Sequence, residues 1–552
     1  MQMKYANYPK TFKRKKIGAS ASIQLKETTK WRWAQFICLK CFKNVPRKLF
    51  CYLLLLVIIH WDQYKLFWQY QKRMNFEYDK NVSALEHIFI YNSFIYDRPP
   101  ADSISGGKMQ LVVLYLAETW HQIMDDMECM VVKNGIIVKR MASKKEYIKS
   151  LHLCALELYI LTCTLDGLKK DSVLFEDVAQ RNMYSLILPE RNRRHRHSIK
   201  ITLNPIRPSY QKRGLVLCMS RVLLYEKWQL LITGLEAYRL FKVDLVVTHI
   251  QSALLSVFEL LKAYEQLGIL RIMPGIRLPH QRGMRWDPNA ETEFNGQILL
   301  AHECFYEYRE SAQFIGLIDW DDLLVPSRHF STLPAAFAAA FAQNPDTAYF
   351  LVNKLEASFV EQRVKYPAEF SLRKLLKDGI RTAEMYNDEK MVVRPKALRG
   401  FWMHNSQNVE PNKRAVKMFT NYSIILHLAN EERANPDEFQ TSFMKKFNIS
   451  KMDLHASEQL RKLNNSKLPS SQPFYNALVN CHSQIFAFYK SVGPGGSGCL
   501  SYSLCVLPRL PEAMCAVTKS KFDTVFTRSG TVFHARQYSE FGHERCIKES
   551  GI

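Results

Sequence analysis

An alternation of short apolar runs with amphipathic segments between residues 215 and 273 restricts this chain to a small set of folds. The runs 215–219, 245–249 and 269–273 have the length and composition of buried strands. Between them, residues 228–241 and 253–267 place apolar side chains at helical spacing. Strands joined by helices with short links form right-handed crossovers. The sequence therefore predicts an α/β fold with a mixed, mostly parallel sheet flanked by helices.

Another apolar run, residues 314–318, is followed by the motif Asp319-Trp320-Asp321-Asp322, which contains three carboxylates. In parallel sheets, ligands bind at the carboxyl ends of the strands, where we expect these groups. Residues i and i+2 of an extended segment face the same way, so Asp319 and Asp321 can bind one cation. Mg²⁺ and Mn²⁺ prefer such oxygen ligands and keep positions free for phosphates. A solvated turn, or a helix N-cap formed by Asp321 or Asp322, is the alternative.

A second group of candidate residues lies about seventy positions further on. Lys390 and Arg394 are candidates to neutralise the phosphates of a donor, and His404 is a candidate third metal ligand. Taken singly, such a histidine is more often structural, and such basic residues are more often solvated. The chain has no Walker-type glycine loop and no nucleophile elbow, which argues against ATP and serine-hydrolase chemistry. The glycine-rich run 493–498 is interpreted as a flexible break before the Cys-rich tail.

Positive charge is concentrated at the N-terminus of this 552-residue chain. Residues 1–48 hold thirteen Lys/Arg and one acid, so they carry +12 of the formal net charge of +24. The uncharged run 49–61 follows; as a helix it would be about 20 Å long, short of the hydrocarbon core of about 27 Å in thin internal membranes. Snorkelling lysine and arginine and flanking aromatics reduce that deficit. We expect a cytoplasmic tail at 1–48 and a membrane anchor at 49–68; an ordinary buried helix or strand is the alternative.

The remainder of the chain divides by composition into a stem at 69–108, a main domain at 109–430 and a C-terminal extension at 431–552 with a Cys-rich tail. The cysteines near the C-terminus suit disulfides in an oxidising compartment: Cys499, Cys505, Cys515 and Cys546. Four N-x-[ST] sequons are compatible with a lumenal location: Asn81, Asn421, Asn448 and Asn464.

Taken in order, a series of segments resembles glycosyltransferase family 92, with coverage from about residue 90 to 430. The matching segments are 90–98, 215–218 with Tyr225, Glu226 and Trp228, 241–249, 263–268, 302–309, 318–326, 393–395 and His404. The ordered set is far more specific than any one segment, so the chain is identified as similar to this family.

The resemblance implies a GT-A fold, a type II membrane topology in the Golgi and a divalent metal, usually Mn²⁺. It implies an inverting transfer of a hexose, commonly galactose from UDP-galactose, onto a glycan acceptor. Mapped onto this chain, Asp319 and Asp321 hold the metal with His404 as a weaker third ligand. Asp319, Lys390 and Arg394 bind the donor. The resemblance also implies that Cys218 and Cys304 are paired in a disulfide.

The chain also departs from the family pattern. The segment 220–225 lacks the proline and glycine that the family shows after its first strand, which predicts an altered nucleotide loop. Asp322 stands where the family commonly has Glu. An inverting transfer needs a carboxylate base, for which Glu384, Asp388 and Glu389 are candidates by position only.

Two other functions compete with catalysis. A non-catalytic relative would keep the fold and bind glycans or protein partners, as the altered segment 220–225 allows. A basic protein that binds nucleic acid or another acidic polymer is the second alternative, suggested by the net charge. Half of the excess charge lies in residues 1–48 and no RNA- or DNA-binding module is visible, so we expect no nucleic-acid partner.

Overall fold

The computed structural model describes part of the chain in detail. The described residues are 86–97, 106–118, 127–133, 136–148, 154–165, 183–190, 197–281, 284, 286–364, 366–382, 389–430, 448–463, 468–492, 499–527, 530–536 and 539–546. The predicted tail at 1–48, the predicted anchor at 49–68, Glu384 and Asp388 lie outside them. None of the helices within the described ranges has both the length and the apolar character needed to cross a membrane.

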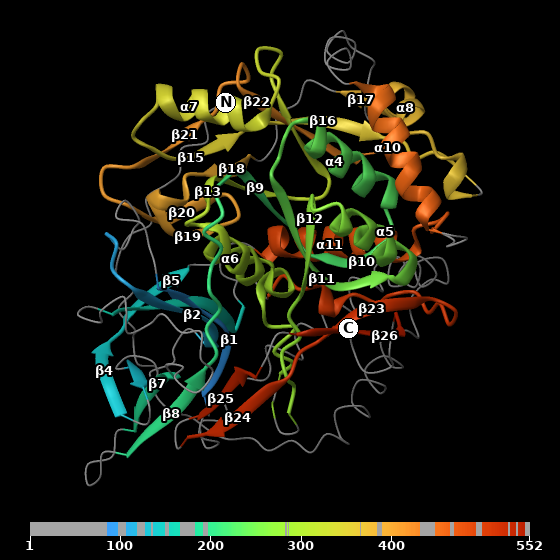
Figure 1. Cartoon of the computed structure of the whole chain (residues 1–552). Coiled ribbons are helices and arrows are strands. Elements are labelled where there is room, and N and C mark those ends of the chain that lie inside the picture. Colours follow the sequence, from blue (N-terminus) through green and yellow to red (C-terminus); the bar gives the residue numbers. More distant parts are fainter. Residues whose placement is uncertain are drawn as a thin grey trace, which may run out of the picture. The chain divides into compact units, whose positions relative to one another are not determined.

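A mixed sheet, here called the central sheet, is built mainly from residues after 212 (Figure 1). Its order is β21-β15-β18-β13-β9-β11-β23-β26, and β10 and β12 also pair with β11. The strands are β9 (Arg213–Met219), β10 (Val222–Tyr225), β11 (Leu245–Leu254), β12 (Leu270–Pro274), β13 (Ala312–Ile318), β15 (Thr347–Val352), β18 (Lys390–Val393), β21 (Arg414–Lys417), β23 (Met514–Lys519) and β26 (Glu540–Arg545). The pairs β13/β9, β9/β11 and β11/β12 are parallel, as the sequence predicts.

Helices cover both faces of the central sheet. Leu215 and Leu217 of β9 pack into one core with α4 (Trp228–Leu240), α5 (Leu255–Gln266), α7 (Leu333–Gln343) and α10 (Ile449–Lys462). Val216 and Cys218, which alternate with them, pack on the other side with α6 (Gln297–Tyr308). Alternate residues of a strand point to opposite faces, so an uninterrupted apolar run is the pattern of a strand covered on both sides. The predicted α/β fold is confirmed.

A smaller sheet lies beside the central one, in the order β14-β22-β16-β17. Its strands are β14 (Asp322–Pro326), β16 (Lys354–Phe359), β17 (Ile380–Thr382) and β22 (Ser423–Asn430). A hairpin of β19 (Leu398–Trp402) and β20 (Asn405–Val409) follows β18. Since β14 begins directly after β13, the chain leaves the central sheet and enters the smaller one at the predicted acidic motif.

Strands alone form the described part of residues 86–203. Together with β24 (Phe522–Phe526) and β25 (Gly530–Ala535) from the C-terminal extension, they make two sheets, β24-β25-β1-β2-β6-β5 and β4-β3-β7-β8. The two sheets pack face to face around one apolar core and are here called the sandwich. The strands are β1 (Glu86–Tyr96), β2 (Gln110–Glu118), β3 (Glu128–Lys133), β4 (Ile136–Ala142), β5 (Lys144–Ile148), β6 (Leu156–Thr164), β7 (Met183–Glu190) and β8 (His197–Leu203). The predicted domain at 109–430 thus includes most strands of both the sandwich and the central sheet, and β1 of the sandwich lies inside the predicted stem.

The C-terminal extension completes both parts of the molecule. After α11 (Pro473–Val492), β23 pairs with β11 of the central sheet, while β25 (Gly530–Ala535) lies parallel to β1 of the sandwich. Figure 1 shows the red strands β25 and β24 (Phe522–Phe526) beside the blue strand β1. Because β25 pairs with β1 and β23 pairs with β11, this extension is an integral part of the fold.

Every cysteine in the described ranges belongs to a disulfide. The pairs are Cys129–Cys163, Cys154–Cys499, Cys218–Cys304, Cys481–Cys505 and Cys515–Cys546. The pairing of Cys218 with Cys304 that the resemblance implies is confirmed, and it ties β9 to α6. The predicted disulfides of the C-terminal cysteines are confirmed as well. Disulfides at this density are typical of proteins that fold in an oxidising compartment.

Candidate active site

The acidic motif forms a turn at the carboxyl end of β13. The N–H of Asp322 donates to the carbonyl of Asp319 at 3.1 Å, which closes the turn. The side chain of Trp320 is buried, and its indole N–H donates to Oγ1 of Thr248 on β11 at 3.3 Å. Asp319 and Asp321, on either side of this indole, are half-buried. The buried tryptophan therefore holds the turn against the sheet and leaves two carboxylates at its edge.

Strand pairing adds a histidine to this motif. Asp322 is the first residue of β14 and lies directly opposite His427 of β22 in the antiparallel register. The Nδ1 atom of His427 donates to Oδ1 of Asp322 at 2.8 Å. Ligand-type atoms of Asp321, Asp322 and His427 all lie within 4.8 Å of one another. Two carboxylates and one imidazole at this spacing are a donor set that a divalent cation accepts.

Asp322 is fully buried and is held by lysines. Lys354, the first residue of β16, places its Nζ 2.9 Å from Oδ1, and Nζ of Lys390 lies 3.7 Å from Oδ2. Burial raises the pKa of Asp322, but Lys390, His427 and Lys354 together bring that pKa below its usual value. Oδ2 accepts no hydrogen bond from the described residues. Asp322 is therefore an ionised carboxylate with one oxygen still available.

Asp319 has its own cationic partner. One of its oxygens pairs with Nζ of Lys390, and the other accepts a hydrogen bond from Nε2 of Gln297 at 3.3 Å. Burial raises the pKa of Asp319, but the ammonium of Lys390 outweighs this and the pKa is lowered. Burial alone would lower the pKa of Lys390, whereas Asp319 and Asp322 raise it. This corner of the site is thus an ion pair between a buried lysine and a half-buried carboxylate.

Asp321 is the carboxylate without such compensation. No hydrogen bond or ion pair joins its side chain to any other residue that the structure describes. Burial raises its pKa first, and the negative charges of Asp322 and Asp319 raise it further against the opposing effect of His427. A cation at Asp321 would remove this excess negative charge, which makes Asp321 the most suitable ligand of the three.

The other predicted site residues divide into two places. Lys390 and His404 lie near Asp319, since both lower its pKa. The Nδ1 atom of His404 donates to the backbone carbonyl of Glu389 at 2.7 Å, and the carboxylate of Glu389 pairs with Lys417.

Arg394 lies elsewhere. β18 runs antiparallel to β13, so Arg394 follows the end of β18 that is remote from Asp319. Its guanidinium donates to the carbonyls of Pro345 and Phe341, at 3.0 and 3.3 Å, and lies over the Phe341 ring. It lines a cavity of about 730 Å³ with residues that begin β9 and β13. The structure thus does not bring Arg394 to the acidic motif.

Three site residues were missed from the sequence: His427, Lys354 and Gln297. Each sits in or beside an apolar run, where a single polar residue gives little signal. Only the pairing of β14 with β22, and of β22 with β16, brings His427 and Lys354 to Asp322. A charged residue inside an otherwise apolar strand is the one available hint, because such a residue is rarely buried without a partner.

The segment after β9 departs from the family pattern in its side chains. Residues 222–225 form β10, which pairs with β11 through two irregularities. Within it, Leu224 has a φ of 45°, in the left-handed region that favours glycine. Leu224 is buried against Phe474 of the C-terminal extension. The left-handed backbone at Leu224 is therefore present without glycine, and a side chain of the C-terminal extension packs against it.

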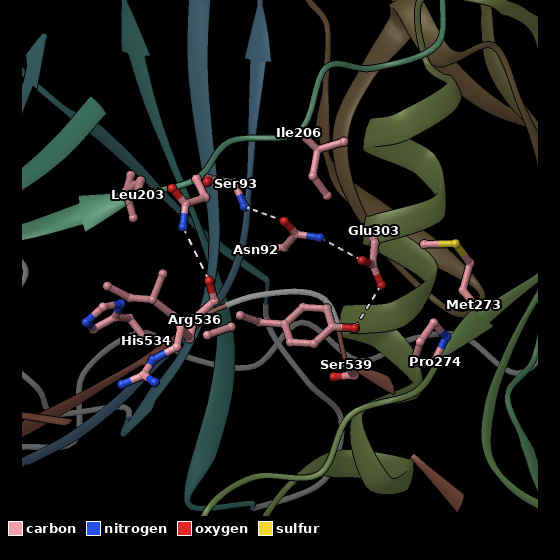
Figure 2. A pocket seen from close by; sticks show the side chains of 14 residues that line it. Asn92, Ser93, Leu203, Ile206, Met273, Pro274, Glu303, His534, Arg536 and Ser539 are labelled. Atoms are coloured by element: carbon pink, nitrogen blue, oxygen red, sulfur yellow. Dashed lines mark hydrogen bonds between the residues drawn. The ribbon is translucent and has the colours of Figure 1, made fainter. Parts of the chain in front are cut away.

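A second cavity, of about 360 Å³, lies between β1, β12 and α6 (Figure 2). Glu303 of α6 is buried beside it and accepts hydrogen bonds from Tyr91, Asn92 and His249, at 2.9, 2.6 and 2.9 Å. Figure 2 shows Asn92 and Glu303 pointing toward each other across the junction of sandwich and helix. Because these polar groups satisfy one another, they join the segments 90–98 and 302–309 and leave the acidic motif as the reactive site.

The fold and the site together define a class. The central sheet is mixed, has helices on both faces and carries a D-x-D motif at the carboxyl end of a central strand. This is the GT-A arrangement of nucleotide-sugar transferases. Residues 213–468 match the model of glycosyltransferase family 92, so this part of the chain is similar to that family.

Curated relatives come from Caenorhabditis elegans. Glycosyltransferase family 92 protein ZK381.2 is 24% identical over 326 residues, which cover 56% of this chain and 63% of that protein. Protein F59C6.8 is 26% identical over 60% of this chain and 68% of its own length. Protein F55C10.4 is 23% identical over 79% of this chain and 86% of its own length. The match thus spans less than two thirds of the first of these relatives.

Solved structures show weaker likenesses. The mannosyltransferase PcManGT from Pyrobaculum calidifontis, in complex with GDP-Man and Mn²⁺, is 11% identical with a TM-score of 0.24, over 51% of this chain and 84% of that one. S. aureus TarS 1-349, in complex with UDP-GlcNAc, is 13% identical with a TM-score of 0.23, over 50% and 82%. Similarity at this level leaves the site to be interpreted from its own geometry.

Proposed function

We propose that this protein is an inverting glycosyltransferase that moves a hexose from a UDP-sugar onto a glycan acceptor with the help of a divalent cation. The match of residues 213–468 to the family model supports the reaction class. The observation that carries the proposal is the uncompensated carboxylate of Asp321 at the carboxyl edge of the sheet, next to Asp322 and His427. The first donor to test is UDP-galactose, the common donor of the family that the sequence resembles.

The residues present fit a divalent cation. His427 uses Nδ1 to donate to Asp322, which leaves Nε2 as its metal-binding nitrogen. An imidazole oriented by a carboxylate is the usual arrangement around a metal-bound histidine. We assign Asp321 and His427 as ligands, with the free Oδ2 of Asp322 as a third, and Mn²⁺ as the expected ion. When bound, such an ion supplies Lewis-acid stabilisation of a diphosphate leaving group.

The remaining groups of the site bind and orient. Lys354 holds Asp322 in place, and Asp322 in turn fixes the ring of His427. Lys390 holds Asp319 in place through an ion pair and contributes positive charge near the phosphates. We assign Asp319 to the metal or to the donor ribose. The catalytic base stays unassigned: Glu389 is paired with Lys417, and Glu384 and Asp388 lie outside the described residues.

Replacing the charge of Asp321 tests the proposal. In the Asp321→Asn variant we expect UDP release from UDP-galactose with Mn²⁺ to fall by two or more orders of magnitude, because a cation site acts most strongly in the transition state. The matched control is Asp523→Asn. Asp523 lies on β24 and forms an ion pair with Arg536, and this variant should keep full activity. Full activity in Asp321→Asn, or in the unmodified protein with excess chelator, would contradict the mechanism.

A non-catalytic relative is the second candidate. The ion pairs Lys390–Asp319 and Lys354–Asp322 favour it, because ammonium groups already compensate two of the three carboxylates. A relative of this kind would bind glycan or protein partners and turn over no nucleotide sugar. Screening nucleotide sugars for metal-dependent hydrolysis separates the two candidates, since the proposed enzyme releases nucleotide from at least one of them.

We further propose that the protein is a single-pass type II membrane protein of the Golgi, anchored at 49–68. The five disulfides support an oxidising compartment, and the sequon residues Asn421 and Asn448 are exposed. Digestion with a glycosidase that removes N-glycans should increase electrophoretic mobility, and the protein should stay in membranes after carbonate extraction. An unglycosylated protein released by cell lysis would exclude this topology.

A further inference from the structure

Arg221 is a buried cation in the segment that departs from the family pattern. It lies two residues beyond the end of β9, and only 9% of its surface is exposed. Its Nη1 donates to Oε1 of Gln297 at 3.1 Å, and its guanidinium lies 5.1 Å from the ring centre of Tyr502. Nε and Nη2 are buried without a hydrogen-bond partner among the described residues. Burying two unused charged donors is costly, so a ligand that uses them is expected.

The position of Arg221 joins it to the acidic motif. Gln297, the first residue of α6, accepts from Arg221 with one atom of its amide and donates to Asp319 with the other. Burial lowers the pKa of Arg221 to about 10, against the opposing effects of Tyr502 and Asp319. The guanidinium therefore remains charged at neutral pH. A single amide bridges this cation to the carboxylate at the carboxyl end of β13.

We propose that Arg221 is a donor-binding residue that takes the diphosphate of the nucleotide sugar through its unused Nε and Nη2 donors. A planar guanidinium offers parallel N–H groups that match two phosphate oxygens, and hydrogen bonds between charged groups are the strong ones. Arg221 thus supplies the anion binding that the sequence assigned to Arg394, which lies at the opposite end of the sheet. This inference rests on the proposed function, because it requires a nucleotide donor.

The C-terminal extension positions Arg221. The N–H of Phe294 donates to the carbonyl of Leu500, and the N–H of Tyr502 donates to Oδ1 of Asn295, both at 2.8 Å. Phe294 and Asn295 have φ values of 46° and 52°, a left-handed stretch directly before α6. Strained backbone persists where its surroundings fix it. The extension therefore holds the start of α6 that presents Gln297.

Two disulfides fix this positioning segment. Cys499 is bonded to Cys154, and Cys505 is bonded to Cys481, so Tyr502 lies between two covalent attachments. Tyr502 lies beyond residues 213–468, the part of the chain that matches the family model. Tyr502 is thus a positioning residue that this chain adds to the site from outside the matched region.

The proposal is tested by titration calorimetry, which measures the affinities of the full chain for UDP and for uridine in the presence of Mn²⁺. Arg221→Gln should weaken UDP binding roughly 10- to 100-fold, from the lost hydrogen bonds between charged groups, and leave uridine binding unchanged. Arg221→Lys should recover part of the loss, because it restores the charge without the fork. The matched control is Arg213→Gln, which removes a cation at the opposite end of the same strand β9 and should change neither affinity.

Tyr502 gives a second test that does not alter the cation. Tyr502→Phe keeps the aromatic ring under Arg221 and should retain UDP affinity, whereas Tyr502→Leu should weaken UDP binding several-fold. Equal losses for UDP and uridine, or unchanged UDP affinity in both Arg221→Gln and Arg221→Lys, would overturn the assignment. An unmodified protein that binds UDP in an Arg221-dependent way but turns over no donor would support the assignment and refute the proposed enzyme. If neither UDP nor uridine binds, both the assignment of Arg221 and the proposed enzyme are refuted.

Discussion

Asp321 and Asp322 are neighbours in sequence but have opposite electrostatic environments. Asp322 is fully buried between Lys354 and His427, which help lower its pKa, whereas the pKa of Asp321 is raised by burial and by the adjacent carboxylates. Asp322 thus supports the fold, whereas Asp321 is available to bind a cation. Substitution of each by Asn should separate these roles.

We expect Asp322→Asn to lower the free energy of unfolding by about 3–5 kcal/mol, because it leaves the buried ammonium of Lys354 without its counter-charge. Asp321→Asn should leave that free energy unchanged or raise it in metal-free buffer, since it removes repulsion. Urea unfolding at pH 7 with chelator measures both. A larger loss of stability in Asp321→Asn than in Asp322→Asn would reverse this interpretation.

His302 is a second residue whose role follows from its surroundings. It is fully buried; its Nδ1 donates to the carbonyl of Ile298, its Nε2 accepts from the N–H of Phe401, and its ring stacks on Phe401. The bond that Nε2 accepts requires the neutral ring, and burial lowers the pKa of His302 to about 4. The histidine of the matched segment 302–309 is therefore structural, joining α6 to β19.

The stability of the protein should consequently fall in acid. An unfolded histidine takes up a proton near pH 6.5 and His302 in the fold near pH 4, so the unfolded state binds more protons between these values. Stability from this group is complete above pH 6.5 and declines toward pH 4, by about 3 kcal/mol in all. His302→Gln should flatten the dependence of the free energy of unfolding on pH between 6.5 and 4.5. Identical slopes in variant and unmodified protein would count against it.

At the scale of elements, the pairing of β14 with β22 decides which histidine joins the acidic motif. The sequence predicts His404 as the third metal ligand, whereas the antiparallel register places His427 opposite Asp322. His404 instead donates its Nδ1 proton to the backbone of Glu389 and remains near Asp319. The two histidines can therefore be compared directly as ligands.

We expect His427→Gln to weaken Mn²⁺ binding 10- to 100-fold, the usual effect of losing a ligand or its support, and His404→Gln to weaken it less. Titration of Mn²⁺ followed by electron paramagnetic resonance measures both affinities without any need for turnover. A greater loss in His404→Gln would restore the ligand set that the family resemblance implies.

At the scale of the whole molecule, the C-terminal extension joins the parts of the fold. It adds β23 to the central sheet, adds β25 to the sandwich and fixes the segment around Tyr502 by disulfides. The bond between Cys154 and Cys499 closes a loop across a sequence separation of 345 residues, the longest of the five. Long closed loops restrict the unfolded chain most.

Replacing both Cys154 and Cys499 by Ser should lower the free energy of unfolding by about 2–5 kcal/mol. It should also weaken UDP binding, because the segment that carries Tyr502 loses one attachment. Urea unfolding and calorimetry on the same preparation measure the two effects, with the Cys129→Ser/Cys163→Ser variant as a control for the loss of a disulfide within the sandwich. That control should lose stability and keep UDP affinity; similar affinity losses in both variants would contradict the positioning role.

Local patterns were enough to predict the α/β unit, the helices α4 and α5, the place of the acidic motif at the end of β13 and the disulfide-bonded character of the C-terminal cysteines. Periodicity and short motifs are properties of neighbouring residues, so they are visible without the fold. The sandwich was not predicted, because its sheet depends on β25, which pairs with β1 from the far end of the chain. His427 lies 105 residues from Asp322, and Tyr502 lies further still from Arg221. Their places in the site follow from strand register and from disulfide connections, and a single sequence contains no local signal for either.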